Sequence, residues 1–217
     1  MGMKKLVIFD LDGTLLNSIA DLAVAVNQAL EKCGYPTHPE DAYRFMVGDG
    51  VMKLFERALP EGEKSEENVL RIRGYFMPFY EEHNADLSCP YDGILELLAE
   101  LKKRGIRMAV ASNKYHAATL KLVAHYFHDT PFELVLGNRE GVPVKPNPQI
   151  VEEILAHTGV AKSDVLYVGD TNVDMKTAIN AEVDCIGVAW GFRPKVELAA
   201  HNPLAIIDKP QELLQYL

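Results

Sequence analysis

Two acidic residues near the start of the chain have the type and spacing of a catalytic pair. Asp10 directly follows the apolar run of residues 6–9, and Asp12 stands two positions further on, just before Gly13. Such a run predicts a strand buried on both faces, and the carboxyl ends of strands are where open α/β sheets bind ligands. One carboxylate there can act as a nucleophile and the other as a general acid and base. A solvent-exposed Asp-Gly turn is the alternative that these residues alone leave open.

More polar groups follow apolar runs further along the chain. They are Ser112 with Asn113, Lys145, and Asp170 with Asp174. Each alone has a structural interpretation as a helix cap or a solvated turn residue, but together they favour one shared site at successive strand ends. The hydroxyl and amide groups at a helix N-terminus favour an anion such as phosphate, and the lysine can balance charge transferred to Asp10.

Four carboxylates at one mouth cannot crowd together unaided. Two unit charges about 4 Å apart repel by roughly 4 kcal/mol at an effective dielectric constant of about 20. The acids concerned are Asp10, Asp12, Asp170 and Asp174. Their proximity requires a divalent cation, and an all-oxygen site beside a phosphate favours Mg²⁺.

The chain after residue 90 alternates between strand and helix patterns. Strands are predicted at 107–111, 132–136, 164–168, 183–188 and 204–207, and helices at 94–101, 115–127, 148–157, 171–180 and from 211. This alternation predicts an α/β fold with a doubly wound, Rossmann-like parallel sheet and right-handed crossovers. The strand at 6–9 is expected to belong to the same sheet.

Residues 18–87 have helical spacing and no strand signal. Ser18 and Gly34 mark the start and end of a first helix, and Ser65 marks the start of the last one. We therefore predict a core domain of residues 1–17 and 88–217, and an inserted all-helical cap domain of residues 18–87. The cap is expected to emerge beside the active end of the first strand.

Composition excludes several classes of partner. The chain has 217 residues, 48% of them hydrophobic, and a formal net charge of −9. A nucleic acid or an anionic membrane would require a basic face, so we expect neither as a partner. The three cysteines, Cys33, Cys89 and Cys185, have no metal or disulfide spacing. No run is long enough to span a membrane or form a signal-peptide core, so a cytoplasmic location is predicted.

In their order and spacing, the polar segments resemble the four motifs of the haloacid dehalogenase superfamily. They are Asp10-Leu11-Asp12-Gly13-Thr14, Ser112-Asn113, Lys145-Pro146 and Gly169-Asp170-Thr171-Asn172-Val173-Asp174. The resemblance covers nearly the whole chain and implies a phosphomonoester hydrolase that forms an aspartyl-phosphate on Asp10. Asp12 would protonate the leaving alcohol and then deprotonate the attacking water.

The same resemblance implies how metal and phosphate are held. The implied Mg²⁺ ligands are Asp10, Asp170 and the backbone carbonyl of Asp12, with Asp174 in an outer shell or sharing the metal. The implied phosphate-binding residues are Thr14, Ser112, Asn113 and Lys145.

Within the cap, the run Val47-Gly48-Asp49-Gly50-Val51 is similar to phosphoglycolate phosphatases. The similarity makes phosphoglycolate the first substrate to test. The cap residues expected to hold a substrate carboxylate are Arg44, Gly48, Asp49, Gly50 and Lys53. Asn17 departs from the Asp often found at its position in that subfamily and in phosphoglucomutases.

Other functions stay open at the level of sequence. Pyrophosphate, nucleoside monophosphates and sugar phosphates are alternative substrates, and a β-phosphoglucomutase-like enzyme would share Asp10 and Asp12. A haloacid dehalogenase is disfavoured because such enzymes lack the second acid, Asp12. A phospho-aspartate receiver module also has an acidic Mg²⁺ site, but it resembles a domain about half this length without a helical insert. The oligomeric state is not predicted.

Overall fold

A six-stranded parallel sheet forms the centre of the molecule. The computed structural model describes residues 3–217, and the strands lie in the order β5-β4-β1-β6-β7-β8. They are β1 (Leu6–Phe9), β4 (Arg107–Tyr115), β5 (Phe132–Asn138), β6 (Val165–Gly169), β7 (Asp184–Val188) and β8 (Ala205–Ile207). The strand order reverses beside β1, which pairs with β4 on one side and β6 on the other. The predicted doubly wound α/β fold is confirmed, and the reversal is where such sheets bind ligands.

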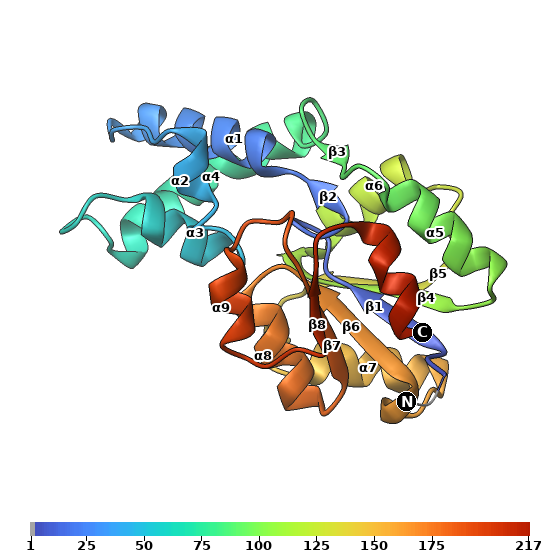
Figure 1. The fold of residues 1–217 in the computed structure, drawn as a ribbon. Helices are drawn as coiled ribbons and strands as arrows, with labels where there is room; N and C mark the ends of the chain where they lie inside the picture. The colour runs from blue at the N-terminus through green and yellow to red at the C-terminus, as the bar shows by residue number, and fades with distance from the viewer. Residues whose placement is uncertain (1–2) are drawn as a thin grey trace.

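Helices cover both faces of this sheet (Figure 1). One face packs against α5 (Ile94–Lys103), α6 (His116–Tyr126) and the 3₁₀ helix η2 (Pro210–Tyr216) through a shared apolar cluster. The other face packs against α7 (Gln149–Thr158), α8 (Asn172–Ala181) and α9 (Lys195–Ala199). A short 3₁₀ turn, η1 (Lys162–Asp164), precedes β6. All four residues of β1 are buried, which explains why they read as a continuous apolar run.

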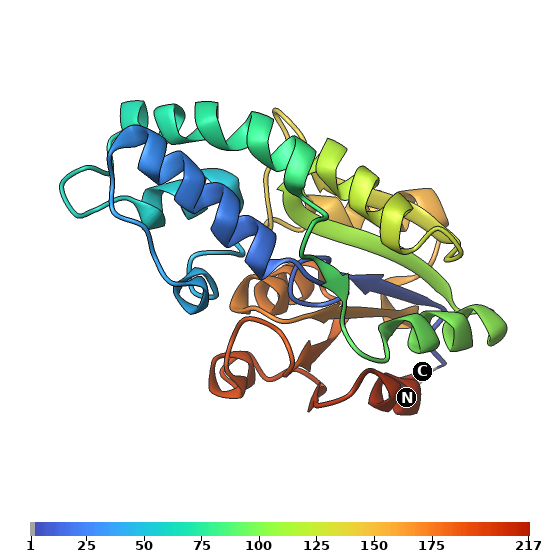
Figure 2. The same ribbon diagram turned by 90° about the horizontal axis from the view of Figure 1, so that it is seen from above.

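A second, helical body lies beside the sheet. It contains α1 (Ile19–Cys33), α2 (Glu40–Tyr43), α3 (Val51–Ala58) and α4 (Glu66–His83), and α1 and α4 run side by side (Figure 2). These helices share a hydrophobic cluster of their own, to which the core contributes Phe192. We call residues 18–87 the cap and the rest the core. We propose that this division corresponds to two domains.

A short two-stranded sheet, which the sequence analysis did not predict, joins the cap and the core. The chain segments that enter and leave the cap pair as a two-stranded antiparallel sheet of β2 (Leu16–Asn17) and β3 (Cys89–Pro90). The carboxylate of Asp21 accepts hydrogen bonds from Leu87 N at 3.0 Å and Ser88 N at 2.8 Å, which ties the same crossing together. Two-residue strands have no periodicity, so no sequence pattern could reveal them.

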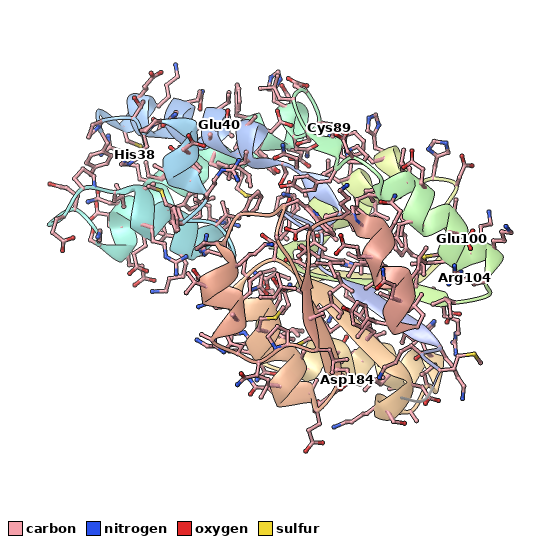
Figure 3. All side chains as sticks on the ribbon, in the orientation of Figure 1. His38, Glu40, Cys89, Glu100, Arg104 and Asp184 are labelled. Atoms are coloured by element: carbon pink, nitrogen blue, oxygen red, sulfur yellow. The ribbon has the colours of Figure 1, made fainter. Side chains whose placement is uncertain are left out.

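The cap covers the carboxyl ends of the strands. Asp184, the first residue of β7, lies at the end of the core remote from the cap, whereas His38 and Glu40 mark the outer part of the cap (Figure 3). All three cysteines are free thiols, as predicted. Over the residues described, no helix combines the length and apolar character needed to cross a membrane.

Candidate active site

Asp10 stands at the carboxyl end of β1, in the middle of the sheet. Its backbone N–H donates to Val168 O of β6 at 2.9 Å, which fixes it at the point where the strand order reverses. The residue is only 7% exposed, and its carboxylate accepts from Leu11 N at 2.7 Å. Lys145 Nζ lies 3.0 Å from the same carboxylate. Asp10 is therefore a buried, oriented carboxylate with one cation beside it.

Lys145 is held in place from several directions. Its Nζ pairs with Asp10 and lies 2.8 Å from Asp174 Oδ1 and 3.1 Å from the Tyr167 hydroxyl. Its backbone N–H donates to Asn113 Oδ1 at 2.8 Å, and its carbonyl accepts from Asn113 Nδ2 at 3.0 Å. Burial opposes its charge, but Asp10 and Asp174 raise the pKa of Lys145 well above its usual value. It therefore stays a cation.

Asp170 and Asp174 complete an acidic cluster with Asp10. One carboxylate oxygen from each lies within 4.8 Å of the others. Burial and the charge of Asp174 raise the pKa of Asp170 to about 7, and burial and the same charge raise the pKa of Asp10 well above its usual range. Side chains at Gly13 or Gly191 would collide with Asp170, so both positions need glycine for the loops to close around this carboxylate.

Asp170 and Asp174 differ in the number of hydrogen bonds that their carboxylates accept. Asp174 Oδ1 accepts from Lys145 and Tyr167, and Oδ2 accepts from the Thr171 backbone N–H at 3.0 Å and hydroxyl at 2.7 Å. Asp170 has only one donor on each oxygen, Thr14 Oγ1 at 3.0 Å and Phe192 N at 2.8 Å. Asp170 therefore keeps lone pairs for a ligand, whereas Asp174 is already saturated and is better placed to hold Lys145.

This donor set fits a hard divalent cation. Asp10 and Asp170 offer carboxylate oxygens in a buried cluster whose raised pKa values reflect an uncompensated excess of negative charge. A cation between these oxygens would relieve that excess, and hard cations prefer oxygen ligands. The cluster can therefore hold a metal ion.

Asp12, the second predicted acid, has its own cation. Lys114 Nζ lies 3.1 Å from each of its carboxylate oxygens, and the Ser18 hydroxyl donates to Oδ1 at 2.5 Å. Ser18 was predicted to cap the first helix, but its side chain makes no capping bond there. Lys114 was not among the predicted site residues. Because β4 continues to Tyr115, Lys114 shares a strand face with Ser112, and a longer predicted strand would have indicated this.

Of the predicted phosphate-binding residues, Ser112 and Asn113 line the cavity, whereas Thr14 and Lys145 are buried and do not. Ser112 lines the cavity, and its hydroxyl accepts from Lys114 N at 3.1 Å. Asn113 uses its amide N–H groups on Lys145 O and on Gly48 O, each at 3.0 Å. Thr14 donates its hydroxyl to Asp170 and is fully buried. The side chains of Asn113 and Thr14 therefore orient neighbours in this structure.

The cap residues predicted to bind substrate separate into two groups. Gly48 and Gly50 line the cavity, and Arg44 reaches the core, where its Nη1 donates to Gly191 O at 3.3 Å. Asp49 pairs with Arg57 and does not line the cavity. Lys53 is exposed, pairs with Glu56 and borders a separate hollow on the outside of the cap.

The positions of Asp49 and Lys53 do not support their predicted contact with substrate. Val51 and Leu54 of α3 line the cavity. The intervening Lys53 turns outward because successive helical residues are about 100° apart around the helix axis.

A cavity of about 50 Å³ lies between the core and the cap and is lined by residues of both. Its core wall is polar and includes Asp10, Asp12, Ser112 and Lys114. Its cap wall is apolar apart from one hydroxyl, and consists of Leu22, Val47, Gly48, Gly50, Val51, Leu54, Phe76 and Tyr80. The cavity therefore presents an oriented carboxylate pair and the Lys114 cation to a small molecule, and Lys145 and the metal-compatible cluster contact Asp10 from outside the lining.

Comparisons with known proteins agree with this geometry. The sequence profile of the haloacid dehalogenase-like hydrolases matches residues 7–188. The chain is 35% identical to a phosphoglycolate phosphatase of Vibrio parahaemolyticus over 97% of this chain and 95% of that protein. It is 32% identical to a phosphoglycolate phosphatase of Haemophilus influenzae over 98% of each. A solved structure of a predicted phosphoglycolate phosphatase from Haemophilus somnus has a TM-score of 0.91 at 29% identity, covering 100% of this chain and 99% of that one.

The chain therefore belongs to the haloacid dehalogenase-like hydrolases. Within that family it is a phosphatase, which confirms the enzyme class predicted from the four motifs.

Proposed function

We propose that this protein is a Mg²⁺-dependent phosphomonoester hydrolase that works through an aspartyl-phosphate on Asp10, with phosphoglycolate as its first candidate substrate. The observation that carries the proposal is the placement of Asp10. It is a buried carboxylate in contact with Lys145, within the same small cavity as Asp12. A nucleophile, a neighbouring cation and a second acid are the groups that such a reaction needs.

The reaction proceeds in two balanced steps. An Asp10 oxygen attacks phosphorus, and the bond from phosphorus to the leaving oxygen breaks. That oxygen takes a proton from Asp12. In the second step Asp12, now deprotonated, takes a proton from water, whose oxygen attacks phosphorus while the bond to Asp10 breaks and phosphate leaves. Lys114 and Ser18 hold the Asp12 carboxylate in position, and Lys145 balances the charge that moves on and off Asp10.

Asp10, Asp170 and the carbonyl of Asp12 would hold Mg²⁺, with Asp174 fixing Lys145 outside the metal's ligand shell. When bound, the ion would neutralise phosphoryl oxygens and lower the repulsion between Asp10 and Asp170. The contact of Thr14 supports this assignment. Its hydroxyl donates one hydrogen bond to Asp170 Oδ1, which leaves the other lone pair of that oxygen available to a metal ion.

Two features support a small substrate. The cavity of about 50 Å³ is closed on the cap side by aliphatic and aromatic side chains. The curated relatives at 30–35% identity over nearly the full chain carry the name phosphoglycolate phosphatase. A two-carbon leaving group fits such a cavity better than a nucleoside or a hexose.

Phosphate release from a panel of esters, with and without Mg²⁺, tests the proposal. The panel contains phosphoglycolate, sugar phosphates, nucleoside monophosphates, pyrophosphate and an aryl phosphate. We expect Mg²⁺-dependent release with the highest kcat/KM for phosphoglycolate. Preference for another ester would overturn the substrate, and hydrolysis that is unaffected by chelation of divalent ions would overturn the metal requirement.

A further inference from the structure

The hydroxyl of Tyr80 is a buried polar group whose proton has no acceptor. Tyr80 is 1% exposed, lies on α4 and lines the cavity. Among residues 3–217, no acceptor takes the proton of this hydroxyl, and the side chain beside it is the ammonium group of Lys114. Leaving a buried donor unpaired costs about 1–3 kcal/mol. A phenylalanine would fill the same space without that cost, so packing alone does not account for the hydroxyl.

The ring of Tyr80 already has its packing partners. It stacks on Phe76 with centroids 4.9 Å apart and planes 18° apart, and Lys114 Nζ lies 4.8 Å from its centroid. Burial raises the pKa of the Tyr80 phenol above its usual value, so it keeps its proton and acts as a donor. The hydroxyl is therefore a fixed, neutral donor in an otherwise apolar wall.

Lys114 supplies a second donor beside this hydroxyl. An ammonium group has three N–H donors, and two of them are used on the carboxylate oxygens of Asp12. The third lies beside the Tyr80 hydroxyl, whose oxygen can accept it while the phenol proton stays without an acceptor. Because Asp12 lies where the leaving oxygen is protonated in the proposed reaction, Tyr80 and Lys114 lie at the leaving-group side of the cavity.

We propose that the Tyr80 hydroxyl and the third N–H of Lys114 together bind the carboxylate at the far end of a short phosphate ester, and so determine which leaving group is accepted. The inference rests on the proposed function and adds to it the residues that recognise the leaving group. The neighbouring side chains Leu22, Val51 and Leu54 are apolar and offer that end of the substrate no hydrogen bond. An ester that ends in a methyl group would leave the Tyr80 proton without an acceptor, which is a strong basis for discrimination.

Tyr80→Phe removes only the hydroxyl and tests the inference. The readout is the ratio of kcat/KM for phosphoglycolate to kcat/KM for ethyl phosphate, in which a methyl group replaces the carboxylate. We expect this ratio to fall by about 10- to 100-fold in the variant, since a hydrogen bond to a charged group is lost. Activity on ethyl phosphate should change less than about twofold. Tyr75→Phe, on an exposed part of the same helix, is the matched control and should change neither value.

The possible outcomes separate the inference from the proposed function. An equal loss on both esters would overturn the inference, because the hydroxyl would then serve the fold or the phosphoryl step. No loss on either ester would overturn it as well. If the wild-type enzyme prefers a different ester, the phosphoglycolate assignment fails. The same ratio, measured with that ester and its analogue lacking the terminal polar group, then decides the role of Tyr80. Since the hydroxyl proton has no acceptor in the fold, the melting temperature of Tyr80→Phe should not fall.

Discussion

The two walls of the cavity are built on opposite principles. On the core wall, Asp10, Asp12 and Lys114 are each fixed by charged or hydrogen-bonded partners. On the cap wall the side chains are aliphatic or aromatic, and Tyr80 supplies their only hydroxyl. In the proposed reaction, the first wall would hold the charge that moves, and the second would contact the leaving group.

This difference indicates how one reaction can serve different substrates. Repositioning a core acid would disturb several partners at once, because Lys145 alone contacts Asp10, Asp174 and Tyr167. Changing one of the cap side chains that line the cavity disturbs packing but no ion pair. We therefore expect core substitutions to reduce turnover of every ester, and substitutions at the cap wall to alter the preference among esters.

The largest effect is expected for Asp10→Asn. The amide is nearly the same size but is a far weaker nucleophile, so kcat should fall by on the order of 10⁴-fold or more for every ester. The fold should persist, and without metal the melting temperature should not fall, because one of three clustered acids becomes neutral. Steady-state assays and thermal denaturation measure both. Activity near the wild-type value would disprove the assignment of the nucleophile.

A smaller loss is expected for Asp12→Asn, on the same wall. Without the acid and base, kcat should fall by about 10²–10⁴-fold, and the phosphoenzyme should accumulate because its hydrolysis needs a base. An aryl phosphate, whose leaving group needs little protonation, should retain a burst of product release equal to one enzyme equivalent. Rapid-quench measurement of that burst is the test, and normal steady-state turnover would contradict the role of Asp12.

The core wall was largely predictable from sequence, for a physical reason. Parallel strands in a doubly wound sheet all end at one edge, so residues as distant as Asp10, Lys145 and Asp170 must converge once the strands are recognised. The strand and helix alternation also predicted the sheet and its crossovers. Short elements without periodicity, such as α9 and the β2–β3 pair, were not predictable.

The cap wall was predictable only in part. The helix predicted to start at Ser65 is present, with Phe76 and Tyr80 on its packed face, but no pattern reveals that Tyr80 lines the cavity. Lys53 was expected at the site because of its charge, yet it projects from the opposite face of α3. Contacts between cap and core depend on how two bodies are placed in space, and one sequence carries no periodic signal for that.

A third prediction concerns the junction between the two walls, and its effect should be smaller again. Arg193 of the core donates from Nη2 to Val47 O at 2.9 Å and to Phe45 O at 3.3 Å, and its guanidinium lies 5.5 Å from the Phe45 ring. Arg193→Ala should weaken the closed arrangement and raise KM by up to about tenfold for phosphoglycolate and ethyl phosphate alike. Arg104→Ala, directly after the end of α5 and far from the cap (Figure 3), is the control. A change confined to one ester would contradict a general closing role.

The smallest expected effect is a shift in stability that belongs to the core wall alone. Because the folded protein raises the pKa of Asp170 from 3.8 to about 7, the folded state binds this proton more tightly than the unfolded state does. The stability contributed by that proton is complete below about pH 4 and is lost as the pH rises through 7. With metal removed by a chelator, the melting temperature should therefore fall between pH 5 and pH 8.

Mg²⁺ should reverse this loss, because the ion replaces the missing proton among the carboxylates. Thermal denaturation with and without Mg²⁺ should show a stabilisation of a few degrees at pH 8 and less at pH 5, since about 1 kcal/mol corresponds to roughly 2–4 °C at this size. Asp170→Asn should flatten the pH dependence, whereas Tyr80→Phe should leave it unchanged. If Mg²⁺ stabilised the protein equally at both pH values, the acidic cluster would not be the place where it binds.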